Sequence, residues 1–255
     1  MWNPDLYRQF QAERDRPFFD LVGQLPDLSP AHVTDLGCGT AHQTAALARR
    51  WPQAEVSGVD SSAEMLSQAP KLANLGLMQA DLRNWTPAEA PDLLISNAAL
   101  QWVPGHDRLI PRLADLVAAD GVFAFQVPGN FTAPSHLLLG ALRSEPRWQA
   151  RLGPPERGPE SLPSLDPLDY ADLLTPLGFR VNAWETTYLH LLHGEDAVLN
   201  WVRGTALRPV LSRLSGEEAA EFEAEYGRRL RQAYPQGPSG TAFAFRRVFV
   251  VAQRT

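Results

Sequence analysis

Acidic residues and glycines stand together in this chain at the end of a short apolar run, a combination typical of ligand-binding turns. The stretch 35–41 reads DLGCGTA and follows the run 31–34. Two glycines one residue apart let the backbone turn sharply and approach a ligand that a Cβ atom would hold off. The next segment, 42–51, has helical spacing, and the free N–H groups of a helix start point at such a ligand. The stretch therefore predicts a nucleotide-cofactor loop.

The charge of Asp35 distinguishes between two kinds of cofactor. A dinucleotide site follows the pattern G-x-G-x-x-G, with a pyrophosphate at the helix start. Here His42 takes the place of the third glycine, and the carboxylate of Asp35 would repel a pyrophosphate. S-adenosylmethionine (SAM) carries an ammonium and a sulfonium, which a buried acid attracts. The loop resembles the D-x-G-x-G-x-G loop of class I SAM-dependent methyltransferases, with Ala41 in place of the last glycine.

Three further segments end in polar residues at the spacing of alternating strands and helices. A second strand, 55–60, ends at Asp60, about 20 residues beyond the loop, where a carboxylate accepts both ribose hydroxyls. A third strand, 77–82, carries Asp81, which in the resembled family pairs with the adenine amino group. A fourth, 92–97, ends at Asn97 beside the expected methyl donor. Singly, each acid is more often a solvated loop residue or a helix cap, but four such ends in order favour one shared site.

Composition limits the class of protein. The 255 residues carry a net charge of −6, and their Lys and Arg residues are scattered, so we expect no nucleic-acid partner. Cys38 is the single cysteine, which excludes an internal disulfide framework and gives no support for a metal site. The absence of an apolar run of about 18 residues and of a signal-type start predicts a cytoplasmic protein without membrane contact. The oligomeric state is left open.

The order of elements predicts an α/β fold, a Rossmann-like seven-stranded, mostly parallel sheet of the class I methyltransferase type. The later elements that we expect are a helix at 107–117 with Pro111 in its first turn, a fifth strand at 121–127, a helix at 170–177, a sixth strand at 179–188 and a seventh at 242–252. We predict a single domain over 1–255, with the cofactor-binding core at 31–128.

Three segments would form caps on the substrate side of this domain, because ligands of open α/β sheets bind outside the carboxyl ends of the strands. They are 1–26, 129–167 and 190–240. The first has helical spacing with a break near Pro17. Within the second, 143–167 is rich in proline and predicts an extended linker or lid. The third contains a helix that is opened by Ser215, with Glu218 in capping-box position, and runs to about residue 233.

The expected chemistry depends on the methyl acceptor. A carbon or hydroxyl acceptor needs a general base, whereas a carboxylate is already ionised and needs only cations and donors to hold it. The polar groups near the expected mouth favour the second case: Arg14, Arg16, Tyr188, His190, Arg203, Arg208 and Arg247. Arg14 and Arg203 are more often solvated helix charges. Pro209 favours presentation of Arg208 from a fixed loop, and Trp102 is either a wall of the site or a core residue.

Several motifs spread over nearly the whole chain are similar to the trans-aconitate 2-methyltransferase family. They are WNPxLY at 2–7, AERxRP at 12–17, NAxLQW at 97–102, TTYxH at 186–190, LRP at 207–209 and FxRxFxVA at 245–252. The resemblance implies that a small anionic carboxylate, trans-aconitate, becomes a methyl ester and that SAM leaves as S-adenosylhomocysteine (SAH). The stretch 143–167 is longer and richer in proline than the resemblance implies, so the preferred polycarboxylate could differ.

The predicted site therefore contains no catalytic side chain, only positioning residues. The predicted cofactor contacts are Asp35, Gly37, Cys38, Gly39, Asp60, Ser61, Met65, Asp81, Leu82, Asn97 and Ala98. The predicted substrate contacts are Arg16, Trp102, Tyr188, His190, Arg208 and Arg247. Two alternatives stay open: a base-dependent methyltransferase that acts on carbon, nitrogen or a hydroxyl with His106 or His190 as base, and a SAM-binding module without turnover.

Overall fold

The computed structural model describes residues 11–153 and 164–255, with side chains from residue 15 onward. It divides into two compact units. The first, called the sheet unit, comprises 15–129, 163–186 and 247–255. The second, called the helical unit, comprises 11–14 and the described parts of 130–162 and 187–246. A single domain with three cap segments stays a prediction.

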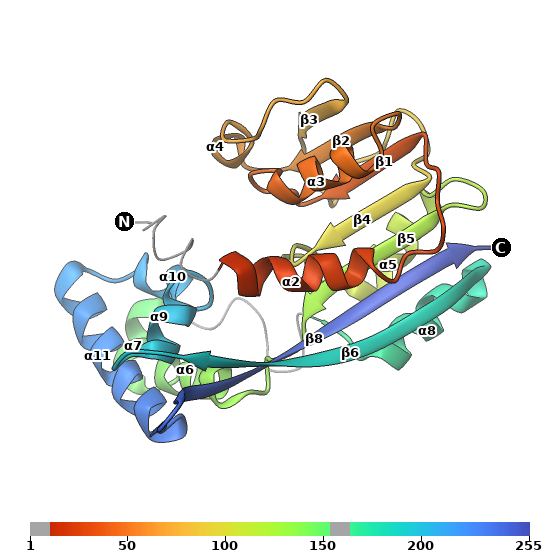
Figure 1. Cartoon of the computed structure of the whole chain (residues 1–255). Coiled ribbons are helices and arrows are strands. Elements are labelled where there is room, and N and C mark those ends of the chain that lie inside the picture. The colour runs from red at the N-terminus through yellow and green to blue at the C-terminus, as the bar shows by residue number, and fades with distance from the viewer. Residues whose placement is uncertain (1–10, 154–163) are drawn as a thin grey trace. The chain divides into compact units, whose positions relative to one another are not determined.

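A mostly parallel sheet forms the centre of the sheet unit (Figure 1). Its strands are β1 His32–Leu36, β2 Glu55–Asp60, β3 Leu75–Gln79, β4 Leu93–Asn97, β5 Val122–Pro128, β6 Phe179–Leu192 and β8 Gly240–Arg254. Of β6 and β8, residues 187–192 and 240–246 belong to the helical unit. Their order is β3-β2-β1-β4-β5-β8-β6; β1 to β5 are parallel, and β8 runs antiparallel to β5. This arrangement confirms the predicted Rossmann-like fold.

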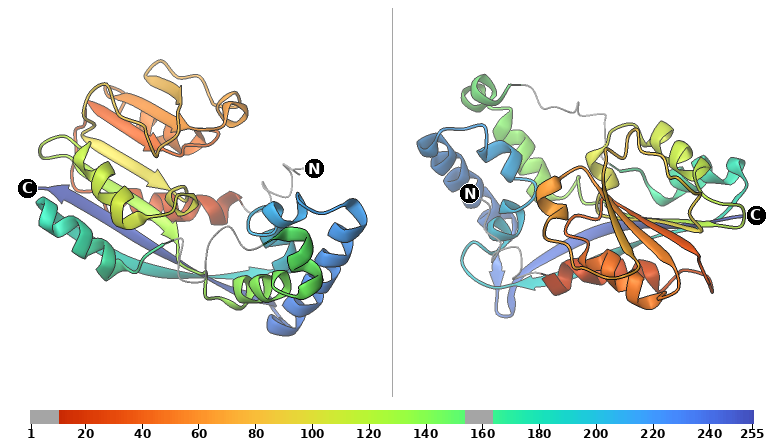
Figure 2. Two further views of the ribbon diagram at one scale, coloured as in Figure 1. Left: turned by 180° about the vertical axis from the view of Figure 1, so that it is seen from behind. Right: turned by 90° about the horizontal axis from the view of Figure 1, so that it is seen from above.

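Helices cover both faces of this sheet, which is why β4 and β5 are apolar almost without interruption. The helices of the unit are α2 Gln11–Val22 (from residue 15 onward), α3 His42–Arg50, α4 Ala63–Leu66, α5 His106–Asp115 and α8 Pro167–Leu174, with short 3-10 turns η1 Leu100–Trp102 and η2 Thr175–Leu177. Figure 2 shows α2 and α3 on one face and α5 and α8 on the other. The core between them is aromatic and aliphatic, with Phe123, Phe125 and Tyr170 fully buried.

Three details of the sheet unit differ from the sequence prediction. Strand β3 ends at Gln79, the register partner of Asp60, so Asp81 lies two residues beyond the strand. Helix α5 begins at His106, which places Pro111 inside the helix and past its first turn. Helix α2 runs through Pro17 without the predicted break. A proline inside a helix costs one hydrogen bond, and here the full burial of Phe18 and Leu21 offsets that cost.

The helical unit has an apolar core of its own, with Trp148, Trp201, Phe222 and Phe243 among its buried residues. Its elements are α6 Pro134–Arg143, α7 Pro146–Leu152, α9 Ala197–Arg203, α10 Arg208–Leu211, α11 Gly216–Ala233 and the short strand β7 Gln236–Gly237, which pairs with the start of β8. The predicted capping box is confirmed: the side chains of Ser215 and Glu218 bond each other's backbone N–H groups. None of the helices in the described part of the chain has the length and apolarity that a membrane crossing requires.

Two prolines of the segment 143–167, which was predicted to be an extended linker or lid, begin helices instead. Pro146 begins α7, and Pro134 and Pro167 begin the helices before and after it. Proline suits the first turn of a helix, where its missing N–H would have no partner and its φ is already helical. Residues 154–163 of the predicted linker lie outside the described residues. Arg208 likewise opens the short helix α10 and does not lie in a loop.

Candidate functional site

The glycine loop after β1 requires both of its glycines. Gly37 has φ +73°, and a Cβ atom there would lie 2.2 Å from the Cβ of Ala99. Gly39 has φ +57°, and a Cβ atom there would lie 3.3 Å from the Cε of Met65. The N–H groups of Gly37 and Cys38 donate to the carbonyl of Val59, at 2.7 and 3.1 Å. The loop is therefore held against β2 and keeps its backbone free of side chains.

Two alanines beside this loop also adopt the left-handed conformation. Ala41 has φ +55° and takes the place of the third glycine, and Ala98, directly after β4, has φ +53°. This conformation costs a non-glycine residue about 1–2 kcal/mol. Ala41 is fully buried, so packing holds it there. Backbone strain of this kind collects at ligand sites.

Asp35 is a buried acid at the end of β1, with 3% of its surface exposed. The hydroxyl of Thr44 donates to its Oδ2 at 2.6 Å. Burial raises the pKa of the Asp35 carboxyl to about 6, although the Thr44 hydrogen bond and the nearby His42 act in the opposite direction. A carboxylate in this position gains from a cation bound beside it.

Asp60, at the end of β2, is fixed by two backbone hydrogen bonds. Its Oδ2 accepts from the N–H of Gly39 and its Oδ1 from the N–H of Ser62, both at 2.8 Å. Each carboxylate oxygen keeps a second lone pair for a hydroxyl donor. Ser62 also caps α4 by accepting from the N–H of Met65 at 3.3 Å, which brings Met65 to Gly39. Ser61, between them, is exposed.

Three further predicted cofactor contacts are Asp81, Leu82 and Cys38. Arg83 donates to both carboxylate oxygens of Asp81, through its side chain and its backbone N–H, and these bonds lower the pKa of Asp81 to about 2. A contact from Asp81 to an adenine amino group would share these oxygens with Arg83 and stays a prediction. Leu82 is partly buried against the main core. Burial raises the pKa of the Cys38 thiol and keeps it neutral.

Asn97, at the end of β4, belongs to a chain of hydrogen bonds. Its Nδ2 donates to Oε1 of Gln43 at 3.0 Å, and Nε2 of Gln43 donates to Oδ1 of Asp15 at 2.9 Å. The same Asp15 oxygen lies 2.6 Å from Nε2 of His42. This chain turns Oδ1 of Asn97 the other way, where it is buried without a hydrogen-bond partner among the described residues. The Asn97 acceptor is thus oriented for a donor from a ligand.

Sequence reasoning missed Asp15, Gln43 and Thr44. The position of Gln43 and Thr44 in the first turn of the helix after the glycine loop was a usable signal, because such residues face the same ligand as the loop. Asp15 gave no signal, since its link to α3 bridges 27 and 28 residues of sequence.

Three predicted substrate residues lie in the sheet unit. Arg16 is exposed and pairs with Asp20 at 3.7 Å. Trp102, at the end of η1, is 60% exposed, so the alternative that it is a core tryptophan is wrong. Arg247 is 6% exposed, and its Nη1 donates to Oε1 of Gln126 at 3.0 Å. Only Arg247 is thus a buried cation.

The other three lie in the helical unit. Strand β6 continues to Leu192 with alternate residues buried, so His190 lies in the strand and not past its end. Tyr188 and His190 are buried on the same face with ring centroids 6.4 Å apart, and His190 stacks on Trp201 at 4.7 Å. Arg208 is exposed at the start of α10. The structure therefore brings Tyr188 and His190 together among the buried residues of this unit. Arg208 is not one of these buried residues.

Two of the three further candidates, His106 and Arg203, have structural partners. His106 is buried, with Nδ1 2.7 Å from the hydroxyl of Tyr170 and Nε2 2.9 Å from the carbonyl of Leu100. Because both ring nitrogens are engaged, His106 is a poor general base. Arg203 pairs with Glu223, in agreement with the solvated interpretation. The side chain of Arg14 lies outside the described residues.

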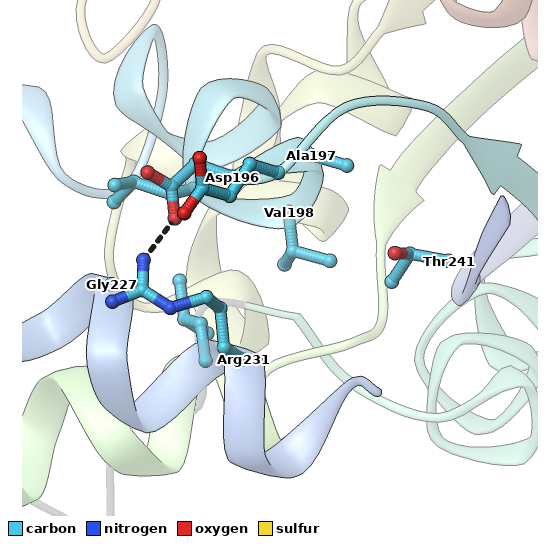
Figure 3. A pocket seen from close by; sticks show the side chains of 9 residues that line it. Asp196, Ala197, Val198, Gly227, Arg231 and Thr241 are labelled. Atoms are coloured by element: carbon cyan, nitrogen blue, oxygen red, sulfur yellow. Dashed lines mark hydrogen bonds and ion pairs between the residues drawn. The ribbon is translucent and has the colours of Figure 1, made fainter. Parts of the chain in front are cut away.

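A pocket in the helical unit does not belong to the predicted site. Asp196, Gly227, Arg231 and Thr241 are among its lining residues (Figure 3). Arg231 donates to Asp196, so these two of the three charged lining residues satisfy each other, and Glu195 is the third. No predicted cofactor or substrate residue lines it.

Comparison with known proteins agrees with the fold. A family model described as a methyltransferase domain matches residues 33–121. The crystal structure of the YcgJ protein from Bacillus subtilis superposes with a TM-score of 0.59 at 13% identity, covering 94% of this chain and 98% of that one. Coclaurine N-methyltransferase gives a TM-score of 0.52 at 15% identity, covering 95% and 72%. These likenesses show the fold alone.

Sequence relatives are much nearer. The chain is 47% identical to a trans-aconitate 2-methyltransferase from Streptomyces avermitilis, over 99% of this chain and 97% of the relative. It is 46% identical to a trans-aconitate 2-methyltransferase from Rhodococcus jostii, over 99% of both chains. The chain belongs to the trans-aconitate 2-methyltransferase family of class I methyltransferases, enzymes that take the transferred methyl group from S-adenosylmethionine.

Proposed function

We propose that the protein methylates a carboxylate of trans-aconitate, or of a similar small polycarboxylate, to give a monomethyl ester and SAH. The observation that carries this proposal is the buried Arg247. It lies in β8, opposite the last residue of β5, at the edge of the sheet where ligands of this fold bind. A buried guanidinium is well suited to hold an anion. A location in the cytoplasm is part of the proposal.

The residues around the glycine loop fit SAM. Asp35 and Oδ1 of Asn97 would hold the cationic methionyl end, Asp60 the ribose, and Asp81 and Leu82 the adenine. Gly37, Cys38, Gly39 and Ala98 would offer backbone, with Ser61 and Met65 beside them. When bound, SAM supplies an electrophilic methyl group on its sulfonium. This acidic site suits SAM better than it suits a dinucleotide, because Asp35 would repel a pyrophosphate.

The proposed acceptor needs no general base. A carboxylate is already ionised at neutral pH, so no proton has to leave it before the new oxygen–methyl bond forms. The chain must bind the anion, orient one of its oxygens and exclude water. This agrees with His106, whose two ring nitrogens are both occupied by structural partners. Arg16 and Trp102, in the sheet unit with Arg247, are proposed as further contacts of the polycarboxylate.

A methyl-transfer assay against small polycarboxylates tests the proposal. Trans-aconitate should be turned over and its product should lose the methyl group in mild alkali, because esters hydrolyse and methyl groups on carbon or nitrogen do not. A neutral amine or alcohol of similar size is the matched control and should not react. Alkali-stable methylation of the neutral acceptor, with no turnover of any polycarboxylate, would reject the carboxylate substrate and favour the base-dependent alternative.

A further inference from the structure

We propose that Gln126 is a specificity-determining residue, whose side-chain Nε2 donates a hydrogen bond to the same acceptor carboxylate that Arg247 binds. The inference rests on the proposed function, because it concerns how that acceptor is recognised. Gln126 was not among the residues that the sequence indicated.

Gln126 is a polar residue in an apolar part of the sheet. It is fully buried in β5, between Phe125 and Val127, which are also fully buried. Burying an amide in such a strand is unfavourable unless its polar atoms are bonded. A glutamine in this place therefore indicates a specific partner for each end of its amide group.

One end of the amide is fixed by Arg247. A guanidinium can only donate, so the oxygen of Gln126 must face Nη1 of Arg247, 3.0 Å away. The amide nitrogen consequently faces away from Arg247. Nε2 is buried and has no hydrogen-bond partner within the described part of the chain. Buried donors are nearly always bonded in native proteins, and leaving one unbonded is costly.

The neighbours of Gln126 indicate what should bind there. In the parallel pairing of β4 and β5, Gln126 is the register partner of Asn97. Asn97 presents an acceptor, Oδ1, and Gln126 presents a donor, Nε2, and both atoms lack a partner among the residues that the structure describes. An acceptor suits the cationic end of the methyl donor, and a donor suits an anionic oxygen. Asn97 would thus contact the methyl donor, and Gln126 would contact the methyl acceptor.

This arrangement favours a carboxylate over other acceptors. Arg247 and Gln126 offer only donors to the ligand, so an ammonium or amine group would meet like-signed partial charges. A carboxylate oxygen accepts from both, and the guanidinium and the amide together fix its plane. Gln126 would therefore select for an acceptor that is anionic, in addition to orienting Arg247.

A Gln126→Glu variant separates the two roles. Glutamate keeps an oxygen for Arg247, with a stronger charged bond, and replaces the donor with a negative oxygen. We expect kcat/KM for trans-aconitate to fall at least about a hundredfold, as for removal of a desolvated charged contact, while SAH affinity by calorimetry stays within about twofold. Unchanged kcat/KM would show that Gln126 only orients Arg247, and would reject the inference while the proposed function stands.

The matched control is Gln253→Glu. Gln253 also accepts from an arginine, Nη2 of Arg180 at 2.7 Å, but it pairs with Val122 at the opposite end of β5. The same chemical change there should leave both kcat/KM and SAH affinity unaltered. An equal loss in this control would reject the inference, since the effect would then follow from added charge alone.

A measurement on the wild-type protein does not depend on the folding of a variant. The side-chain amide protons of Gln126 should move in the NMR spectrum when trans-aconitate is added to the SAH complex, and those of Gln253 should not. A shift of both or of neither overturns the inference. If the SAH complex binds no polycarboxylate at all, the proposed function fails with it, which differs from binding without a response at Gln126.

Discussion

The ends of β1 and β2 offer the opposite chemistry to the end of β5 and the middle of β8 beside it. The first pair presents acids, Asp35 and Asp60, around a loop of bare backbone. The second presents only donors, the guanidinium of Arg247 and the amide of Gln126. Both pairs lie at the carboxyl edge of the parallel strands. The β1–β2 part of it, called the cofactor edge, suits a cation, and the β5–β8 part, called the anionic-ligand edge, suits an anion. The difference teaches how a methyl transfer without a general base can be arranged. The acids would hold the cationic methyl donor, and the donors would hold the anionic acceptor.

The largest expected effect comes from removing the cation of the anionic-ligand edge. Arg247→Ala should lower kcat/KM for trans-aconitate by a factor that corresponds to about 2–5 kcal/mol, because a desolvated anion loses its charged partner. SAH affinity should be unchanged in calorimetry. Arg254→Ala, in the same strand, is the control, since its Nη2 bonds only a backbone carbonyl, that of Ala114 at 2.7 Å, in the interactions that the structure describes. A loss of SAH affinity in Arg247→Ala would contradict the division between the two edges.

The next effect concerns the acids of the cofactor edge. Asp60→Ala should weaken SAH binding by about 1.5–3 kcal/mol, the value for hydrogen bonds to a charged group. Asp92→Ala is the matched control: Asp92 also accepts from two backbone N–H groups, of Ala31 and His32 at 2.7 and 3.0 Å, but precedes β4 at the other end of the sheet. Equal weakening by both substitutions would mean that Asp60 acts only as a loop brace.

Asp35 predicts a pH dependence of stability in the ligand-free protein. Its pKa is about 6 when folded and 3.8 in the unfolded chain, so the folded state binds the proton more tightly. The stability that this provides is complete below pH 4 and is lost as the pH rises through 6. Asp35→Asn removes the dependence, and its free energy of unfolding relative to wild type should rise by about 1–3 kcal/mol between pH 4 and 7.

Urea unfolding of both proteins at several pH values measures this difference. The same variant should bind SAH at least about tenfold more weakly at pH 7.5, since the ammonium loses its counter-charge. If the free energy of unfolding varied with pH in the same way in both proteins, and SAH affinity were unchanged, the charge of Asp35 would affect neither stability nor cofactor binding.

The smallest effect is backbone strain in the loop. Ala41→Gly should raise the free energy of unfolding by about 0.5–1 kcal/mol, because glycine adopts φ +55° without the steric cost that alanine bears. Ala45→Gly, in the interior of α3, should lower it by about 1 kcal/mol. Thermal unfolding compares the two. Destabilisation by both would indicate that the methyl group of Ala41 contributes more through packing than it costs in strain.

The cofactor edge was more predictable from sequence than the rest, for a local reason. A glycine loop between a strand and a helix can be recognised from seven consecutive residues. Strand ends such as Asp60 and Asn97 can be located from the regular alternation of strand and helix patterns. Gln126 could not be found in this way, because in sequence it is one polar residue inside an apolar strand. Its significance comes from Arg247, 121 residues later.

The helical unit was less predictable because proline has two uses. Pro146 was assigned to an extended linker, yet it begins α7. Proline at a helix start and proline in a linker look alike in composition, and only the buried residues that follow, Trp148 and Leu152, distinguish them. His190 was predicted to lie beyond the sixth strand, but β6 continues to Leu192 with alternate residues buried. That alternation could not be recognised from sequence, because it depends on the core residues that cover this part of the strand.

Cys38 gives the cofactor loop a built-in chemical reporter. It is the chain's one cysteine, it is buried, and burial keeps its thiol protonated, so a thiol reagent reacts with it only when the loop opens. The labelling rate therefore measures how often this loop leaves its native position. A ligand that binds only the closed loop slows labelling by a factor of one plus its concentration over its Kd. Cofactor affinity can thus be determined from labelling kinetics without any turnover.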